Sequence, residues 1–136
     1  MPSRTTSSDV PRVLLVDDNA AVLARAAAML SPACTVVAKV TDGAAALAAA
    51  DALHPDVIVL DISMPGMTGF EVAARLRQSG STAALVFLTV HGDEEFVIAA
   101  RAAGVIGYVV KPKLASDLLP AIREACAGRS FVSAMR

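Results

Sequence analysis

The chain has 136 residues, of which 55% are hydrophobic and 18% are charged, and its formal net charge is −1 at pH 7. This length fits one domain whose core needs no disulfide staples, and the apolar content excludes disorder over most of the chain. The near-neutral charge, with no basic run, predicts that this domain does not bind nucleic acid directly.

In chain order, a polar segment comes first and two kinds of stretch then alternate. Residues 1–11 are rich in Ser, Thr and Pro, and we expect a flexible tail there. A domain follows over 12–128, and residues 129–136 form a C-terminal extension or the start of a linker. Short β-branched runs predict strands at 12–16, 35–40, 56–60, 84–89 and 107–110. Segments rich in Ala, Leu and Arg predict helices at 19–30, 43–53, 69–78, 93–103 and 115–128.

Small and polar residues mark the expected helix ends. Glycines follow three of the helical segments, where a left-handed backbone is common, namely Gly80, Gly104 and Gly128. Ser116 or Asp117 is expected to cap the last helix, which would put Pro120 in its first turn. Five strands alternating with five helices predict an α/β fold with a five-stranded parallel sheet and right-handed crossovers.

Polar side chains stand at the carboxyl ends of four predicted strands. Asp17 and Asp18 follow the first strand, Asp61 follows the third, Thr89 ends the fourth and Lys111 follows the fifth. In a sheet of order 2-1-3-4-5 these positions meet at the switch point, where ligands bind. Two unit charges about 4 Å apart repel by about 4 kcal/mol at an effective dielectric of 20. Three carboxylates therefore need a cation, and oxygen ligands favour Mg²⁺, with Mn²⁺ as an alternative.

The Thr89 hydroxyl and the Lys111 ammonium, next to the carboxylates, favour phosphoryl transfer as the chemistry of this site. Donors such as Thr89 and Lys111 stabilise the charge that spreads over the phosphoryl oxygens in the transition state. A carboxylate can itself be the nucleophile and form an aspartyl phosphate. Asp61 is the best candidate because the third strand is central and its end lies between the other groups.

Four motifs in this order carry a family resemblance: VDD at 16–18, LDISMPGMTG at 60–69, LTV at 88–90 and YVVKP at 108–112. Together they resemble the receiver domain of two-component response regulators, over about 12–128. The resemblance implies a doubly wound (βα)5, flavodoxin-like fold. It also implies that Asp61 accepts the phosphoryl group and is itself a metal ligand, while Asp18 holds Mg²⁺ directly and Asp17 holds it through water.

The same resemblance implies roles for the remaining residues. The backbone carbonyl of Ser63 would complete the metal site, Thr89 would donate its hydroxyl to the phosphoryl group, and Lys111 would pair with the phosphoryl oxygens. The Lys111–Pro112 bond would be cis. Tyr108 matches the aromatic switch position, which turns inward when Thr89 is drawn toward the phosphate.

Two positions depart from the commonest choices of the family and are expected to modulate access to Asp61. Ser63 is small and polar, and Val90 is bulkier than the Ala or Gly often found after the threonine. A β-branched side chain there should hinder an attacking water, so we expect a long-lived phosphoryl group. In the loop that follows, Gly66 and Gly69 are expected to supply permissive backbone angles.

The resemblance implies a signalling switch rather than an enzyme with an external substrate. Phosphoryl transfer from a histidine kinase or phosphotransfer protein would be self-catalysed, and autodephosphorylation would reset the switch. The face of helix 4, strand 5 and helix 5 would bind a downstream protein or a second copy. We favour a stand-alone receiver acting through protein contacts. The alternative is the receiver of a DNA-binding regulator whose helix-turn-helix is absent from this chain, because AIREACAGRSFVSAMR at 121–136 resembles a receiver end and linker.

Other readings of the chain fit less well. A Mg²⁺-dependent phosphohydrolase usually needs a second acid two residues after its nucleophile, where this chain has Ser63. A flavodoxin-like cofactor binder is a second alternative, but the acidic crevice would repel the phosphate of a flavin. The cysteines, Cys34 and Cys126, lie in apolar segments and are expected to be reduced core thiols. With no apolar run near the roughly 18 residues of a membrane span and no secretory signal, we expect a cytoplasmic protein without membrane contact.

Overall fold

The computed structural model of the chain describes residues 10–90 and 92–133, so most of the expected tail, residues 1–9, lies outside the described residues. The strands are β1 (Arg12–Val16), β2 (Thr35–Val40), β3 (Val57–Asp61), β4 (Ala84–Thr89), β5 (Gly107–Val110) and β6 (Phe131–Val132). The helices are α1 (Ala20–Leu30), α2 (Gly43–Leu53), α3 (Gly69–Gln78), α4 (Glu94–Ala102) and α5 (Leu114–Cys126), and a short 3-10 turn, η2, spans Lys111–Lys113.

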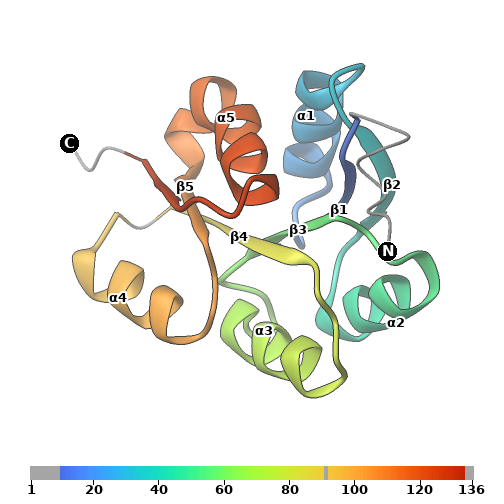
Figure 1. The fold of residues 1–136 in the computed structure, drawn as a ribbon, viewed down its shortest axis with the longest axis vertical. Helices are drawn as coiled ribbons and strands as arrows, with labels where there is room; N and C mark the ends of the chain where they lie inside the picture. Colours follow the sequence, from blue (N-terminus) through green and yellow to red (C-terminus); the bar gives the residue numbers. More distant parts are fainter. Residues whose placement is uncertain (1–9, 91, 134–136) are drawn as a thin grey trace.

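The strands form one parallel sheet in the order β2-β1-β3-β4-β5-β6. Helices α1 and α5 cover one face, while α2, α3 and α4 cover the other (Figure 1). The expected order 2-1-3-4-5 is present, but the expectation of five strands was wrong because β6 adds a sixth at the edge of β5. Two residues are too few to show a strand period in sequence, and β6 forms because β5 offers its free edge.

Strands β1, β3, β4 and β5 are almost entirely buried on both faces, as their apolar composition predicts, whereas the edge strands β2 and β6 are only partly buried. Alternate residues of each central strand enter two separate cores: Leu14 and Ile58 pack toward α2–α4, whereas Leu15 and Val59 pack toward α1 and α5. All five residues of β3 are buried, including its last residue, Asp61. The central strand is therefore held rigidly on both sides, which suits it to present a reactive group at its end.

The start of α5 differs from the sequence prediction. The helix begins at Leu114, directly after η2, so neither Ser116 nor Asp117 caps it and Pro120 lies inside the helix. Burial of Leu114 extends the helix toward its N-terminus, and this outweighs the one backbone hydrogen bond that an interior proline removes. The Lys111–Pro112 bond, inside η2, was also predicted wrongly: it is trans, and among the described residues the cis peptide is Ser31–Pro32.

Several local expectations can be compared with the backbone. The glycines that follow three helices adopt positive φ, with values of 88° at Gly80, 84° at Gly104 and 78° at Gly128, as predicted. Neither cysteine forms a disulfide within the part of the chain that the structure describes, but only Cys34 is buried; Cys126 is exposed on α5, so its core placement was wrong. Within the described residues, none of the helices has the length and apolar character needed to cross a membrane.

Candidate functional site

Asp17 sits at the point where β1 ends and the chain turns into α1. Its side chain is buried, and its Oδ1 accepts a hydrogen bond from the backbone N–H of Asn19 at 2.8 Å. The Asn19 side chain in turn caps α1 by accepting from the N–H groups of Ala21 and Val22 at 2.9 and 3.2 Å. Sequence reasoning gave Asn19 no role, although an Asn directly before a helical segment is a usual cap signal. The cap fixes the turn that orients Asp17.

Asp61 is the last residue of β3 and is only 3% exposed. Its Oδ1 accepts a hydrogen bond from the backbone N–H of Ser63 at 3.2 Å. Gly69, the first residue of α3, approaches this strand end so closely that a Cβ would lie 2.7 Å from the Asp61 carbonyl oxygen. Gly66 has the expected positive φ, but Gly69 does not. Gly69 is needed for close packing against the strand rather than for permissive backbone angles.

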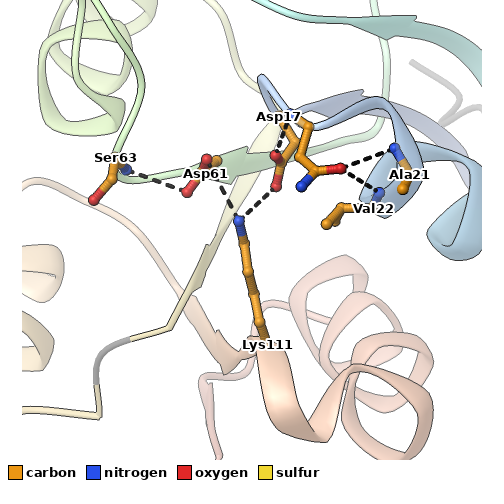
Figure 2. A network of polar contacts seen from close by, with 7 residues as sticks. Asp17, Ala21, Val22, Asp61, Ser63 and Lys111 are labelled. Atoms are coloured by element: carbon orange, nitrogen blue, oxygen red, sulfur yellow. Dashed lines mark hydrogen bonds and ion pairs between the residues drawn. The ribbon is translucent and has the colours of Figure 1, made fainter.

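Lys111 brings a positive charge to both acids. It is the first residue of η2, and its Nζ lies 3.0 Å from Asp17 Oδ2 and 3.5 Å from Asp61 Oδ2. Figure 2 shows its side chain reaching between the two carboxylates from below. The structure therefore brings together residues from β1, β3 and the end of β5, which are far apart in the sequence.

The acidic residues have the arrangement that a divalent cation requires. Asp17, Asp18 and Asp61 each offer a carboxylate oxygen, and these oxygens lie within 4.8 Å of one another. Asp17 Oδ2 is buried and has no hydrogen-bond partner of good geometry among the described residues, beyond the ion pair with Lys111. Asp18 is exposed, so the cluster opens to solvent on that side. A cluster of carboxylate oxygens, buried on one side and open to solvent on the other, is a donor set that fits Mg²⁺.

Burial and nearby charges shift the pKa values of Asp61 and Lys111. Burial, and then the charge of Asp17, raise the pKa of Asp61 to about 6, although Lys111 and the Ser63 N–H act in the opposite direction. Burial alone would lower the pKa of Lys111, but its contacts with Asp17 and Asp61 outweigh burial and raise it. Lys111 therefore stays charged and partly neutralises the two acids.

The other predicted site residues lie around this centre. Thr89 ends β4 and is buried, while Ser63 and Val90 are exposed, Val90 at 63%. Tyr108, in β5, is 2% exposed and packs in the core that faces α4. Burial, and then the charge of Asp93, raise the pKa of the Tyr108 phenol to about 12. The roles assigned to these residues, and to the Ser63 carbonyl, remain predictions.

The model of one protein family, the response regulator receiver domain, matches residues 13–123. The chain belongs to this family. Among solved structures, the receiver resembles a LuxR-family two-component response regulator from Aurantimonas, with a TM-score of 0.86 and 32% identity over 91% of this chain and 90% of that one. It also resembles the receiver domain of the putative response regulator NarL from Mycobacterium tuberculosis, with a TM-score of 0.80 and 32% identity over 88% and 98% of the two chains.

Curated relatives extend beyond the matched region. The receiver is 35% identical to the nitrate/nitrite response regulator protein NarL of Escherichia coli over 89% of this chain and 57% of the relative. It is 38% identical to the positive alginate biosynthesis regulatory protein of Pseudomonas aeruginosa over 83% of this chain and 46% of the relative. The chain thus spans about half the length of these two relatives.

Proposed function

We propose that this receiver is a phosphoacceptor switch in which Asp61 takes a phosphoryl group from a histidine kinase or phosphotransfer protein. One observation carries the proposal: the buried Asp61 carboxylate at the end of the central strand, with the Lys111 ammonium 3.5 Å away and two further acids beside it. A buried nucleophile beside a fixed cation and a potential metal site suits phosphoryl transfer, which depends on positioning and charge stabilisation.

The chemistry uses the chain's own groups. An oxygen of Asp61 attacks the phosphorus, the P–N bond of the donor phosphohistidine breaks, and the leaving imidazole keeps its nitrogen lone pair and takes a proton from solvent. Lys111 stabilises the negative charge on the phosphoryl oxygens, and the Thr89 hydroxyl donates to one of them. Asp17, Asp18, Asp61 and the Ser63 carbonyl would hold Mg²⁺ (or Mn²⁺), which would supply positive charge to the transferring group. In autodephosphorylation, water attacks the phosphorus, releasing inorganic phosphate and restoring the carboxylate.

Acetyl phosphate tests this assignment without a cognate kinase. Wild-type protein incubated with acetyl phosphate and Mg²⁺ should gain one phosphoryl group per chain by intact mass, and EDTA should suppress the gain. Asp61→Asn should not be labelled, while Asp51→Asn, which alters an exposed carboxylate on α2, should be labelled like wild type. Stoichiometric labelling of Asp61→Asn would refute Asp61 as the acceptor.

The output is proposed to run through the face formed by α4, β5 and α5, to a protein partner or a second copy. This assignment treats the receiver as a stand-alone switch. A transcriptional output is the second candidate, because relatives 35–38% identical to this chain have the names of regulatory proteins and are longer than it. The gene sequence after codon 136 distinguishes the two candidate outputs. An in-frame helix-turn-helix supports the transcriptional output, and a stop codon supports the stand-alone switch.

A further inference from the structure

The short strand β6 lies against Tyr108, the residue at the aromatic switch position of the family. It pairs in parallel with β5, with Phe131 opposite Gly107 and Val132 opposite Tyr108. Figure 1 shows it as the red strand beside β5. Paired residues in neighbouring strands point to the same side of the sheet. Val132 and Tyr108 accordingly both belong to the core that faces α4, while Phe131 packs toward α5.

Tyr108 is therefore flanked on both sides within its layer. Phe87 of β4 is its register partner on the inner side, and that ring is held by an edge-to-face contact with Phe70, with ring centroids 4.9 Å apart. Val132 stands on the outer side, where β5 would otherwise be the open edge of the sheet. An outward rotation of the tyrosine ring would need the space that Val132 and its strand occupy.

The end of β6 is fastened by a buried hydroxyl. Ser133 is 2% exposed; its N–H donates to the Tyr108 carbonyl at 2.9 Å, and its Oγ accepts from the Val110 N–H at 3.2 Å. The same hydroxyl donates to Asp117 Oδ2 of α5 at 2.6 Å. One side chain thus joins β5, β6 and α5. A strand of two residues forms few ladder bonds of its own, here the Phe131 N–H donating to the Ile106 carbonyl at 3.1 Å, so the three hydrogen bonds of Ser133 contribute strongly to holding Val132 in place.

We propose that residues 131–133 act as a latch that holds Tyr108 inward and keeps the domain in the arrangement that binds a phosphoryl group. The connection to signalling rests on the proposed receiver function and on the switch role that the family resemblance implies for Tyr108, which turns inward when Thr89 is drawn toward the phosphate. A conformational restraint that favours one state raises the affinity of any ligand that binds this state. Loosening the latch should therefore weaken phosphoryl-site binding without touching the site.

The only tyrosine of a chain without tryptophan reports on the latch directly. Acrylamide quenching of Tyr108 fluorescence should be weak in wild type. Val132→Ala and Ser133→Ala should each raise the quenching constant by about threefold or more, as the outward state becomes a major population. Val132→Ile, which keeps a β-branched side chain beside the ring, and Arg129→Ala, which breaks only an exposed ion pair with Glu124, should behave as wild type. Far-UV circular dichroism checks that each variant is folded.

The second measurement couples the latch to the phosphoryl site. With Mg²⁺ and beryllofluoride as the phosphoryl mimic, quenching in Val132→Ala should return to the wild-type value, and the apparent dissociation constant for beryllofluoride should be about 5- to 10-fold higher than in wild type. Unchanged quenching in both folded variants, Val132→Ala and Ser133→Ala, would overturn the latch. Increased quenching with unaltered beryllofluoride affinity would overturn its coupling to the site. Failure of acetyl phosphate to label wild type would instead refute the proposed function, and the quenching data would still decide the latch.

Discussion

Replacing Asp61 by asparagine should stabilise the metal-free protein at neutral pH. The carboxylate is buried at the end of β3, next to the charge of Asp17, and the Lys111 ammonium offsets this only in part. Asparagine has nearly the same shape, and its amide oxygen can still accept the hydrogen bond from the Ser63 N–H. The substitution therefore removes the buried charge while leaving the packing intact.

The pKa of Asp61 sets the size and the sign of the effect. Burial, and then Asp17, raise this pKa from 3.8 to about 6. A carboxyl group whose pKa is raised by folding contributes stability that is fully present below the unfolded value and is lost as pH rises through the folded value. A shift of about two units corresponds to about 3 kcal/mol at pH 7.5. For a domain of this length that is a Tm difference of about 10 °C.

The assay is thermal or urea unfolding of both proteins in EDTA from pH 4 to 7.5. The variant should be nearly as stable as wild type at pH 4, and its advantage should grow mainly between pH 4 and pH 6. Asp51→Asn, at an exposed position on α2, should show no such growth. Saturating Mg²⁺ should narrow the gap by stabilising wild type. Equal stabilities at pH 7.5, or an advantage that does not change with pH, would refute the charge argument.

Four further outcomes test the site and its surroundings. Lys111→Met leaves two buried carboxylates without their cation, so the metal-free protein should lose about 3 kcal/mol of unfolding free energy, and isothermal titration should show tighter Mg²⁺ binding. Val90→Ala should shorten the half-life of the phosphorylated state by about two- to fivefold, a barrier change of about 0.5–1 kcal/mol; an unchanged half-life contradicts steric shielding by this side chain. Gly69→Ala should cost about 2–3 kcal/mol in urea unfolding because the new Cβ meets the backbone of β3. The absorbance of Tyr108 should show little phenolate at pH 10.5, where an exposed tyrosine is mostly ionised, because its pKa is about 12.

The central sheet could be predicted because its strands follow strong local rules. The predicted runs at 12–16, 35–40, 84–89 and 107–110 coincide with β1, β2, β4 and β5, and the run at 56–60 is one residue from β3. Three of these runs are nearly all apolar, which is typical of strands in a parallel sheet covered on both faces. Because parallel strands end at one edge, the strand ends together with the order 2-1-3-4-5 predict the convergence of Asp17, Asp61 and Lys111.

The features that sequence reasoning missed depend on tertiary contacts. The strand β6 is too short for a period and is held by Ser133, whose partners come from β5 and α5. The early start of α5 depends on burial of Leu114, which outweighs the usual placement of Pro120 near a helix N-terminus. The need for glycine at position 69 arises from the nearby backbone of β3 rather than from its own dihedral angles.

The ammonium of Lys111 also affects how the protein depends on metal supply. It sits inside the acidic cluster as a permanent counterion, 3.0 Å from one carboxylate and 3.5 Å from another. We therefore expect the domain to fold without a divalent cation, unlike small domains in which the bound metal itself stabilises the fold. When the cation is scarce, the chains should remain folded and protected from proteolysis, and only the proposed phosphorylation of Asp61 should be lost. Restoring the cation would then restore responsiveness at once, without new protein synthesis.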